Sequence, residues 1–421
     1  MTFTPAKLLQ IINQLPASRR YWIAYSGGCD SHALLYALAT LCTRLPAVAL
    51  RPIHIDHAIH PRSAEWAQHC VLVCAALDLQ CEIRRVDGRS SPGESPEAAA
   101  RQARYSALAE VVEEGDLLLT AHHADDQAET LLLQLLRGAG PHGLAAMPTV
   151  APFAQGYIAR PLLPFTRADL YGYAAAQSLQ WSDDPSNQEL AYDRNYLRHA
   201  VTPRLQQRWP SWAQVVTRAA SHQAEAAKLC DNLAQLDLAT VATPQPDQLL
   251  IDPLLALSPE RQRNLLRYWL AQLNLPLPTT QQLYQLQKTV LLAARASTPL
   301  VRWPGVEIRR YRNNLYAMPP LQSHDNTQCF YWDTAHTPQF THATGTLTRQ
   351  QLIELGMDAQ RLANGCVTIT YRQGGEKIQL PGRQHHTDLK KYLQERAVPP
   401  WQRDRLPLIE LEGVTVVVGL S

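Results

Sequence analysis

Residues Ser26–Ser31, which read SGGCDS, are the first group in this sequence whose types and spacing suit chemistry. They separate a short β-type run, YWIAY, from a helix-type run, HALLYALATL. Glycines let a backbone approach a ligand closely, and the first turn of a helix offers unbonded N–H groups to an anion. The serines add donors, and the Asp30 carboxylate suits Mg²⁺, which prefers oxygen ligands. The pattern predicts a phosphate-binding loop, and a plain Gly-Gly turn is the alternative.

Two other phosphate-binding motifs are excluded by the sequence. No Lys in the chain follows a Gly, so the string GxxxxGK[ST] is absent. A GxGxxG string does occur at Gly138, Gly140 and Gly143, but it follows a helix-type run. A dinucleotide fingerprint follows a strand, so we interpret this string as a helix stop and a loop.

A second group follows the β-type run DLLLTAH at 116–122. His122 and His123 come first, and Asp125 and Asp126 then open a helix-type run. Ligands of open α/β sheets bind at the carboxyl ends of the strands, so we predict a functional role for Asp126 and a nucleotide or phosphate contact for one histidine. The alternatives are acidic residues that only favour the helix dipole and a structural histidine.

Strand-type and helix-type runs alternate through about the first 190 residues, which contain both groups. Four further β-type runs lie at 49–55, 81–86, 116–122 and 157–163, and helix-type runs separate them. Such alternation predicts an α/β fold with a doubly wound parallel sheet. The pattern becomes helical from about 195 to 295. It then returns to β-type runs around a helix, with a hairpin signal at Asn313-Asn314.

Composition and charge limit the class of protein. The chain has 421 residues and a net charge of +2, and its eight Cys include no CxxC pair. Reduced thiols of a cytoplasmic protein fit this usage best. No apolar run is long enough to span a membrane, and the first residues lack the apolar core of a signal peptide.

Two stretches are locally basic in this nearly neutral chain. Residues 194–218 hold five Arg and no acidic residue, and residues 361–405 hold nine Lys or Arg against four Asp or Glu. Each stretch therefore carries a local charge of +5. This pattern indicates an RNA footprint, and a solvated charged surface is the alternative.

Several motifs resemble one known family. SGGCDS resembles the PP-loop of the ATP-pyrophosphatase superfamily, whose members cleave ATP between its α- and β-phosphates. The stretch TAHHADDQAETLLLQLLRGAGPHGLAAMP at 120–148 is similar to the signature of the tRNA(Ile)-lysidine synthases. EAAARQARY at 97–105, HIDH at 54–57, 160–174 and 181–205 fit the same family. YRQGGEKIQLPGRQHHTDLKKYLQERAVPPWQRDRLPLI at 371–409 resembles the C-terminal domain of its longer members.

This resemblance implies a fold, a reaction and partners. The fold is the PP-loop, adenine nucleotide alpha-hydrolase-like type, followed by a helical domain and a small α+β C-terminal domain. We expect a catalytic ATP-binding domain at 1–205, a helical linker or substrate domain at 206–297 and a tRNA-binding domain at 298–421. The implied reaction uses ATP and Mg²⁺ to join free L-lysine to carbon 2 of the wobble cytidine in the CAU anticodon of tRNA(Ile).

The resemblance also implies roles for individual residues. Asp30 and Asp126 are the expected metal ligands. The residues expected to be catalytic are Asp30, Arg101, His123 and Asp126. The residues expected to bind the nucleotide are Ser26, Gly27, Gly28, Cys29, Asp30, Ser31, His54 and Asp56. The residues expected to contact tRNA are Arg101, from the resemblance, and six from the two basic stretches: Arg194, Arg198, Lys390, Lys391, Arg403 and Arg405. Spacing alone supports only a helix ion pair for Arg101, with Glu97 four residues earlier.

Two other functions are weighed against this expectation. A PP-loop tRNA thiolase would need a sulfur-carrying Cys or an iron–sulfur site, and the absent CxxC counts against it. A non-enzymatic RNA-binding protein would not need both SGGCDS and DDQAET intact. The sequence leaves a homodimer open, and it does not identify the base that deprotonates lysine.

Overall fold

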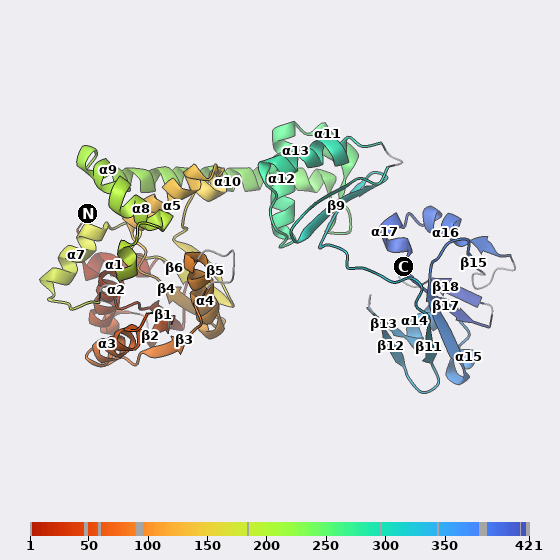
Figure 1. Ribbon diagram of the computed structural model, residues 1–421, viewed down its shortest axis with the longest axis horizontal. Coiled ribbons are helices and arrows are strands. Elements are labelled where there is room, and N and C mark those ends of the chain that lie inside the picture. Colours follow the sequence, from red (N-terminus) through yellow and green to blue (C-terminus); the bar gives the residue numbers. More distant parts are fainter. Residues whose placement is uncertain are drawn as a thin grey trace. The chain divides into compact units, whose positions relative to one another are not determined.

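The computed structural model describes residues 2–45, 49–57, 60–89, 96–182, 185–294, 297–342, 345–378, 385–412 and 414–417. The chain forms two compact units, Met1–Cys230 and Asp231–Ser421 (Figure 1).

The first unit is built on a six-stranded sheet with the strand order β3-β2-β1-β4-β6-β5. Its strands are β1 (Arg20–Ala24), β2 (Ala49–Asp56), β3 (Glu82–Arg85), β4 (Asp116–Leu119), β5 (Val150–Phe153) and β6 (Gly156–Ala159). All neighbours are parallel except β5, which runs antiparallel to β6 at the edge. The predicted parallel α/β sheet is confirmed. The edge strand β5 was not predicted, and its Pro152 is tolerated there because an edge strand can lose a donor.

Helices cover both faces of this sheet. The helices α1 (Pro5–Ile12), α2 (Cys29–Thr40), α3 (Ser63–Ala75) and α7 (Arg167–Ala176) share one hydrophobic core with Tyr21 and Ile23. On the other face, α4 (Pro96–Val111) packs with Trp22 and Leu118. Successive strand residues point to opposite faces of the sheet, so a continuous apolar run such as YWI contributes side chains to both hydrophobic cores.

The remaining helices of the first unit follow the strands that carry the candidate site. They are α5 (Ala124–Leu136), α6 (Pro141–Leu144), α8 (Asp193–Tyr196), a π-helical turn η3 (Leu197–Val201) and α9 (Thr202–Arg208). Two short 3₁₀ turns are η1 (Cys42–Arg44) and η2 (Pro185–Gln188). The Ala- and Gln-rich stretch forms one helix of 30 residues, α10 (Trp212–Val241).

The second unit begins with a helical layer on a four-stranded antiparallel sheet, β7-β10-β9-β8. Its elements are β7 (Gln248–Leu250), α11 (Ile251–Ala256), α12 (Pro259–Gln272), α13 (Thr280–Leu286), η4 (Gln287–Leu291), β8 (Leu300–Trp303), β9 (Val306–Tyr311) and β10 (Asn314–Met318). The expected hairpin is present, but Tyr311 pairs with Asn314, so its turn is Arg312-Asn313. One hydrophobic core contains side chains from these helices and from β8–β10, which lie on both sides of the predicted domain boundary at 297/298. The predicted domain bounds remain a prediction.

The C-terminal part of the second unit is the expected α+β region. Its main sheet has the order β11-β14-β17-β18, from Phe330–Asp333, Cys366–Tyr371, Pro407–Leu411 and Val414–Val417. Two small hairpins are β12 (Gln339–His342) with β13 (Gly345–Thr348), and β15 (Lys377–Ile378) with β16 (Thr387–Asp388). The helices are α14 (Arg349–Glu354), α15 (Ala359–Asn364), α16 (Leu389–Glu395) and α17 (Pro400–Arg403).

Candidate active site

The SGGCDS loop lies between the end of β1 and the first turn of α2. Gly27 has φ +83°, which favours glycine, and a Cβ built there would meet the Sγ of Cys70 at 3.0 Å. Ser31 Oγ accepts from the backbone N–H of Ser26 at 3.2 Å and donates to the carbonyl of Gly28 at 3.0 Å. Gly28 is the N-cap of α2 and has no side-chain capping bond, so the helix start suits an anion.

Three carboxylates surround the imidazole of His123. Its Nε2 lies 3.5 Å from an oxygen of Asp30 and 3.3 Å from one of Asp126, and its Nδ1 lies 3.6 Å from Asp125. Burial lowers the pKa of His123, but these carboxylates raise it to about 10. Asp30 Oδ1 is buried and has no hydrogen-bond partner. The loop after β1 and the helix after β4 therefore bring the negatively charged side chains of Asp30 and Asp126 close together.

His123 also fixes the start of α5. Its backbone N–H donates to Asp126 Oδ2 at 3.1 Å, which ties the Asp126 side chain to the first turn of the helix. Asp125 has a different role, because it accepts from the backbone N–H of Arg167 at 2.8 Å, at the start of α7. Gln127 anchors the following loop through two bonds of 2.9 Å with the backbone of Met147.

A half-buried ion-pair network lies one helical turn further along α5. Arg194 contacts Asp126 and Glu129 at 3.0 Å, and Arg198 contacts the same two carboxylates at 2.8 Å. Burial raises the pKa of Asp126, but His123 and Arg194 outweigh it and leave that pKa lowered. Glu129 is 2% exposed. Sequence reasoning missed Glu129, although its position three residues after Asp126 places both carboxylates on one helix face.

His54 and Asp56 lie at the carboxyl end of β2, beside the end of β1. Burial lowers the pKa of His54, whose Nδ1 lies 3.0 Å from the carbonyl of Tyr25 and 3.4 Å from the Sγ of Cys70. Asp56 is buried and lies 3.6 Å from Arg85. Both residues therefore stand at the ligand-binding edge of the sheet, next to the SGGCDS loop. A nucleotide contact by either stays a prediction.

Arg101 is exposed on α4, and its guanidinium lies 4.8 Å from the ring centre of Tyr105. His122 lies close by at the end of β4, with its Nδ1 2.8 Å from the hydroxyl of Thr120. Burial lowers the pKa of His122 to about 3, and the positive charges of Arg194, Arg160 and Arg101 act in the same direction. The His122 ring is therefore neutral, in contrast to the neighbouring His123.

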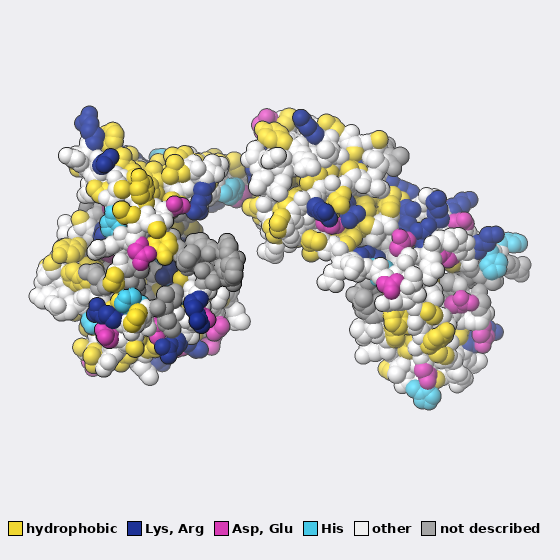
Figure 2. All heavy atoms as spheres, viewed as in Figure 1, with side chains coloured by type: hydrophobic (Ala, Val, Ile, Leu, Met, Phe, Trp, Pro, Cys, Tyr) yellow, Lys and Arg dark blue, Asp and Glu magenta, His cyan; other side chains and the backbone are white. Residues whose placement is uncertain are grey.

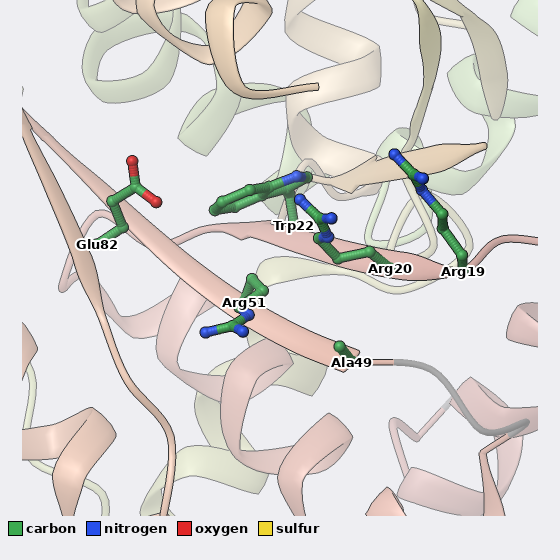
Figure 3. A pocket seen from close by; sticks show the side chains of 6 residues that line it. All are labelled: Arg19, Arg20, Trp22, Ala49, Arg51 and Glu82. Atoms are coloured by element: carbon green, nitrogen blue, oxygen red, sulfur yellow. The ribbon is translucent and has the colours of Figure 1, made fainter. Parts of the chain in front are cut away.

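A cavity of about 440 Å³ lies at the opposite edge of the sheet, where β1 and β2 begin (Figure 3). It is lined by Arg19, Arg20, Trp22, Ala49, Arg51 and Glu82. Arg19 and Arg20 pair with Glu113 and Asp116, which offsets their charge. The cavity is separated from the SGGCDS loop by the length of β1, so it is not part of the candidate active site.

The predicted tRNA contacts of the C-terminal region differ in exposure. Lys390 and Lys391 are exposed on α16, and Figure 2 shows Lys and Arg side chains gathered around that segment. Arg405 is half-buried and donates to the carbonyl of Gln322. Arg403 is 8% exposed, and it donates to the carbonyl of Val398 and the hydroxyl of Tyr311, both at 2.9 Å. The guanidinium of Arg403 thus joins α17 to β9 inside the second unit.

Comparisons with known proteins decide the family. A PP-loop domain model matches residues 2–205, a TilS substrate binding domain matches 249–316, and a TilS substrate C-terminal domain matches 367–420. A tRNA(Ile)-lysidine synthase of Coxiella burnetii is 44% identical over 99% of this chain and 92% of its own. The chain belongs to the tRNA(Ile)-lysidine synthase family. The family resemblance inferred from SGGCDS and the 120–148 stretch is confirmed.

Other relatives in the lysidine synthase family match over similar lengths. The synthase of Methylococcus capsulatus is 42% identical over 95% of this chain and 91% of its own. The synthase of Escherichia coli O157:H7 is 39% identical over 98% of this chain and 94% of its own. Among solved structures, the U34-tRNA thiolase NcsA from Methanococcus maripaludis has 17% identity and a TM-score of 0.45, over 52% of this chain and 78% of its own. Within the described residues, no helix is long and apolar enough to cross a membrane.

Proposed function

We propose that this chain joins free lysine to carbon 2 of the wobble cytidine in the CAU anticodon of tRNA(Ile), forming lysidine. ATP supplies the activation, and AMP and pyrophosphate leave. The observation that carries the proposal is the match to lysidine synthases over 99% of the chain, together with the substrate binding domain at 249–316. The active-site geometry supports it, because a phosphate-binding loop and a carboxylate cluster meet at one edge of the sheet.

The reaction proceeds in two steps. The carbon-2 oxygen of the cytidine attacks the α-phosphorus of ATP, and pyrophosphate departs. The ε-amine of lysine then attacks carbon 2, and AMP departs. The chain's part in the first step is to hold the phosphates on the start of α2, where Gly28 leaves the helix uncapped. An unstacked anticodon base can enter a pocket at the same edge, as single-stranded RNA bases do.

Asp30 and Asp126 fit a Mg²⁺ ion. Asp30 has a buried carboxylate oxygen without a partner, and both carboxylates lie within 3.5 Å of one imidazole nitrogen. Among the described residues, no group of three or more His, Cys, Asp or Glu is placed to hold a metal. Mg²⁺ is commonly bound by one or two carboxylates plus substrate phosphates, so a pair is sufficient. The ion would neutralise charge on the α-phosphate and on pyrophosphate.

Label transfer tests this function directly. The full-length chain is incubated with a tRNA(Ile) transcript, ATP, Mg²⁺ and radiolabelled lysine, and the label in RNA is counted. We expect label that depends on ATP, and none in a control transcript whose wobble cytidine is replaced by uridine. Wild-type protein that forms AMP but leaves no label in the RNA would contradict lysidine formation.

The rival function, tRNA thiolation, is distinguished in the same assay by replacing lysine with a sulfur donor. The cysteine spacing argues against it, because none of the eight cysteines pairs as CxxC. Incorporation of sulfur without lysine would favour the rival. Light scattering on the same preparation tests whether the protein is a monomer or a homodimer.

A further inference from the structure

The cavity at the amino ends of β1 and β2 is built by one face of the sheet. Parallel pairing places Trp22 beside Arg51, and Arg20 lies two residues before Trp22 on β1. Side chains two residues apart on a strand share a face, so Arg20, Trp22 and Arg51 lie on the same side. Glu82 pairs with Ile53 on β2, two residues after Arg51, and therefore joins them. Figure 3 shows these four lining side chains, which come from three neighbouring strands.

The guanidinium of Arg20 is held in place without the use of its hydrogen-bond donors. It lies 5.6 Å from the ring centre of Trp22, and its nitrogens lie 3.6 Å from Asp116 and 3.7 Å from Glu113. These distances exceed the length of a hydrogen bond. The two carboxylates therefore offset the charge of Arg20, but the described part of the chain leaves its N–H groups without an acceptor.

Arg51 has no carboxylate partner among the described residues. It is exposed on β2, directly beside Trp22 of β1. Glu82, the carboxylate that lines the cavity, pairs with Arg84 on its own strand, at 2.6 Å. A carboxylate has about four acceptor positions, so Glu82 keeps capacity for a further donor. The cavity thus offers the donors of two guanidiniums together with one partly used carboxylate.

Arg19 shows what an arginine of this edge does when its role is structural. Its Nε donates to Asp116 at 3.1 Å, and its Nη2 donates to Glu113. Asp116 is 1% exposed and also accepts from Nε1 of Trp22 at 3.1 Å. This network joins the starts of β1 and β4 without any donor from Arg20. The stability of the edge therefore does not account for the guanidinium of Arg20 or of Arg51.

We propose that this cavity binds the phosphate of a nucleotide, at a site separated from the SGGCDS loop by the length of β1. The planar guanidiniums of Arg20 and Arg51 match phosphate oxygens, and Glu82 accepts from a sugar hydroxyl or a base amino group. The volume of about 440 Å³ falls within the range of small-molecule sites, roughly 300–1,000 Å³. The nucleotide is either free in solution or part of an RNA chain, and the phosphate chemistry is the same for both sources.

Binding measurements on the full-length chain test this site. The variants are Arg20→Gln and Arg51→Gln. The matched control is Arg62→Gln, because Arg62 is an exposed arginine of the same unit that pairs with Glu65 at 2.9 Å and does not line the cavity. Calorimetry measures the binding of UMP while a saturating ATP analogue, with a methylene group between its α- and β-phosphates, occupies the active site. A tRNA(Ile) transcript is titrated separately at several salt concentrations.

If the site takes a free nucleotide, wild type and control bind UMP beside the analogue, and each variant binds UMP about tenfold or more weakly. If it takes RNA, UMP does not bind, and the log–log salt slope of tRNA binding falls in each variant by ~0.7–0.9 per lost contact. An unchanged salt slope in folded Arg51→Gln, together with UMP binding that is absent from wild type or unchanged in the variant, would overturn the proposal whether or not Arg20→Gln folds. None of these measurements involves lysine transfer, so their outcome is independent of the proposed function.

Discussion

At the scale of single residues, the candidate site depends on charges that the fold gathers at one imidazole. Asp30 and Asp126 come from the first turns of α2 and α5, about a hundred residues apart, yet both reach Nε2 of His123. Their roles differ, because Asp126 is held by two arginines and Asp30 keeps a buried oxygen without a partner. Asp30 therefore has an oxygen available to a cation, whereas Asp126 would bind the same cation while it is also paired with its arginines.

Asp30→Ala is expected to abolish AMP and pyrophosphate formation and to leave the fold intact. The side chain lies in the first turn of α2, is about a third exposed and makes few packing contacts. Its loss therefore removes a negative charge and leaves the hydrophobic core unchanged. Pyrophosphate release is measured with tRNA and ATP, and thermal unfolding checks the fold. Normal turnover in a folded variant would remove Asp30 from the mechanism.

Cys29→Ser is expected to keep substantial activity. Cys29 is the first residue of α2, where its backbone N–H serves an anion whatever the side chain, and its thiol forms no disulfide. Lysine incorporation by the variant is compared with wild type at equal ATP saturation. Complete loss of activity with normal ATP binding would indicate a sulfur-transfer or covalent role and would favour the thiolase.

At the scale of elements, α5 is held against α8 and η3 by the network around Glu129. Glu129 is 2% exposed, and it accepts from Nε of both Arg194 and Arg198, at 3.0 and 2.8 Å. Removing one partner of a buried ion pair leaves the other charge without compensation. The network thus positions the helix that begins with His123.

Glu129→Gln is expected to destabilise the first unit by about 3 kcal/mol, since two half-buried guanidiniums lose one of their two carboxylate partners and keep only Asp126. For a unit of this size the melting temperature would fall by about 6–12 °C in calorimetry. The matched control is Glu260→Gln, whose exposed pair with Arg263 on α12 should leave melting unchanged. Equal melting of both variants and wild type would show that the network carries no stability.

At the scale of the whole molecule, the chemistry and the C-terminal basic surface belong to different compact units. We propose that exposed α16 residues contact tRNA away from the anticodon. Phosphate contacts of this kind position RNA without reading its bases. Lys390 and Lys391 are available for such contacts, whereas Arg403 is held inside the unit by Val398 and Tyr311.

Lys390→Gln combined with Lys391→Gln is expected to weaken binding of all tRNAs and to lower the log–log salt slope by ~0.7–0.9 per lost contact. The single-turnover rate at saturating tRNA should remain that of wild type. Filter binding across salt and rapid quench measure the two quantities. Unchanged affinity and salt slope would show that this surface is only solvated charge. A large loss of the single-turnover rate would show that these residues help to organise the active site.

Features that depend on neighbouring residues were predictable from sequence patterns alone. SGGCDS, the alternation of strand and helix, and the acidic start of α5 are contiguous patterns, and short-range backbone geometry governs them. These patterns were sufficient to predict the parallel sheet, the PP-loop and the family. The edge strand β5 was missed because four residues with a proline carry a weak local signal.

Which charged side chains pair with one another was not predictable from the sequence and is seen only in the folded chain. Arg194 and Arg198 were predicted as RNA contacts from their local charge, but the fold pairs them with carboxylates 65 to 72 residues away. Arg403 has the same local charge as Lys391, yet packing buries it, and Arg160 is left without a carboxylate partner among the described residues. The physical reason is that a guanidinium's partner is set by distances through space, and the order of residues along the chain does not encode these directly.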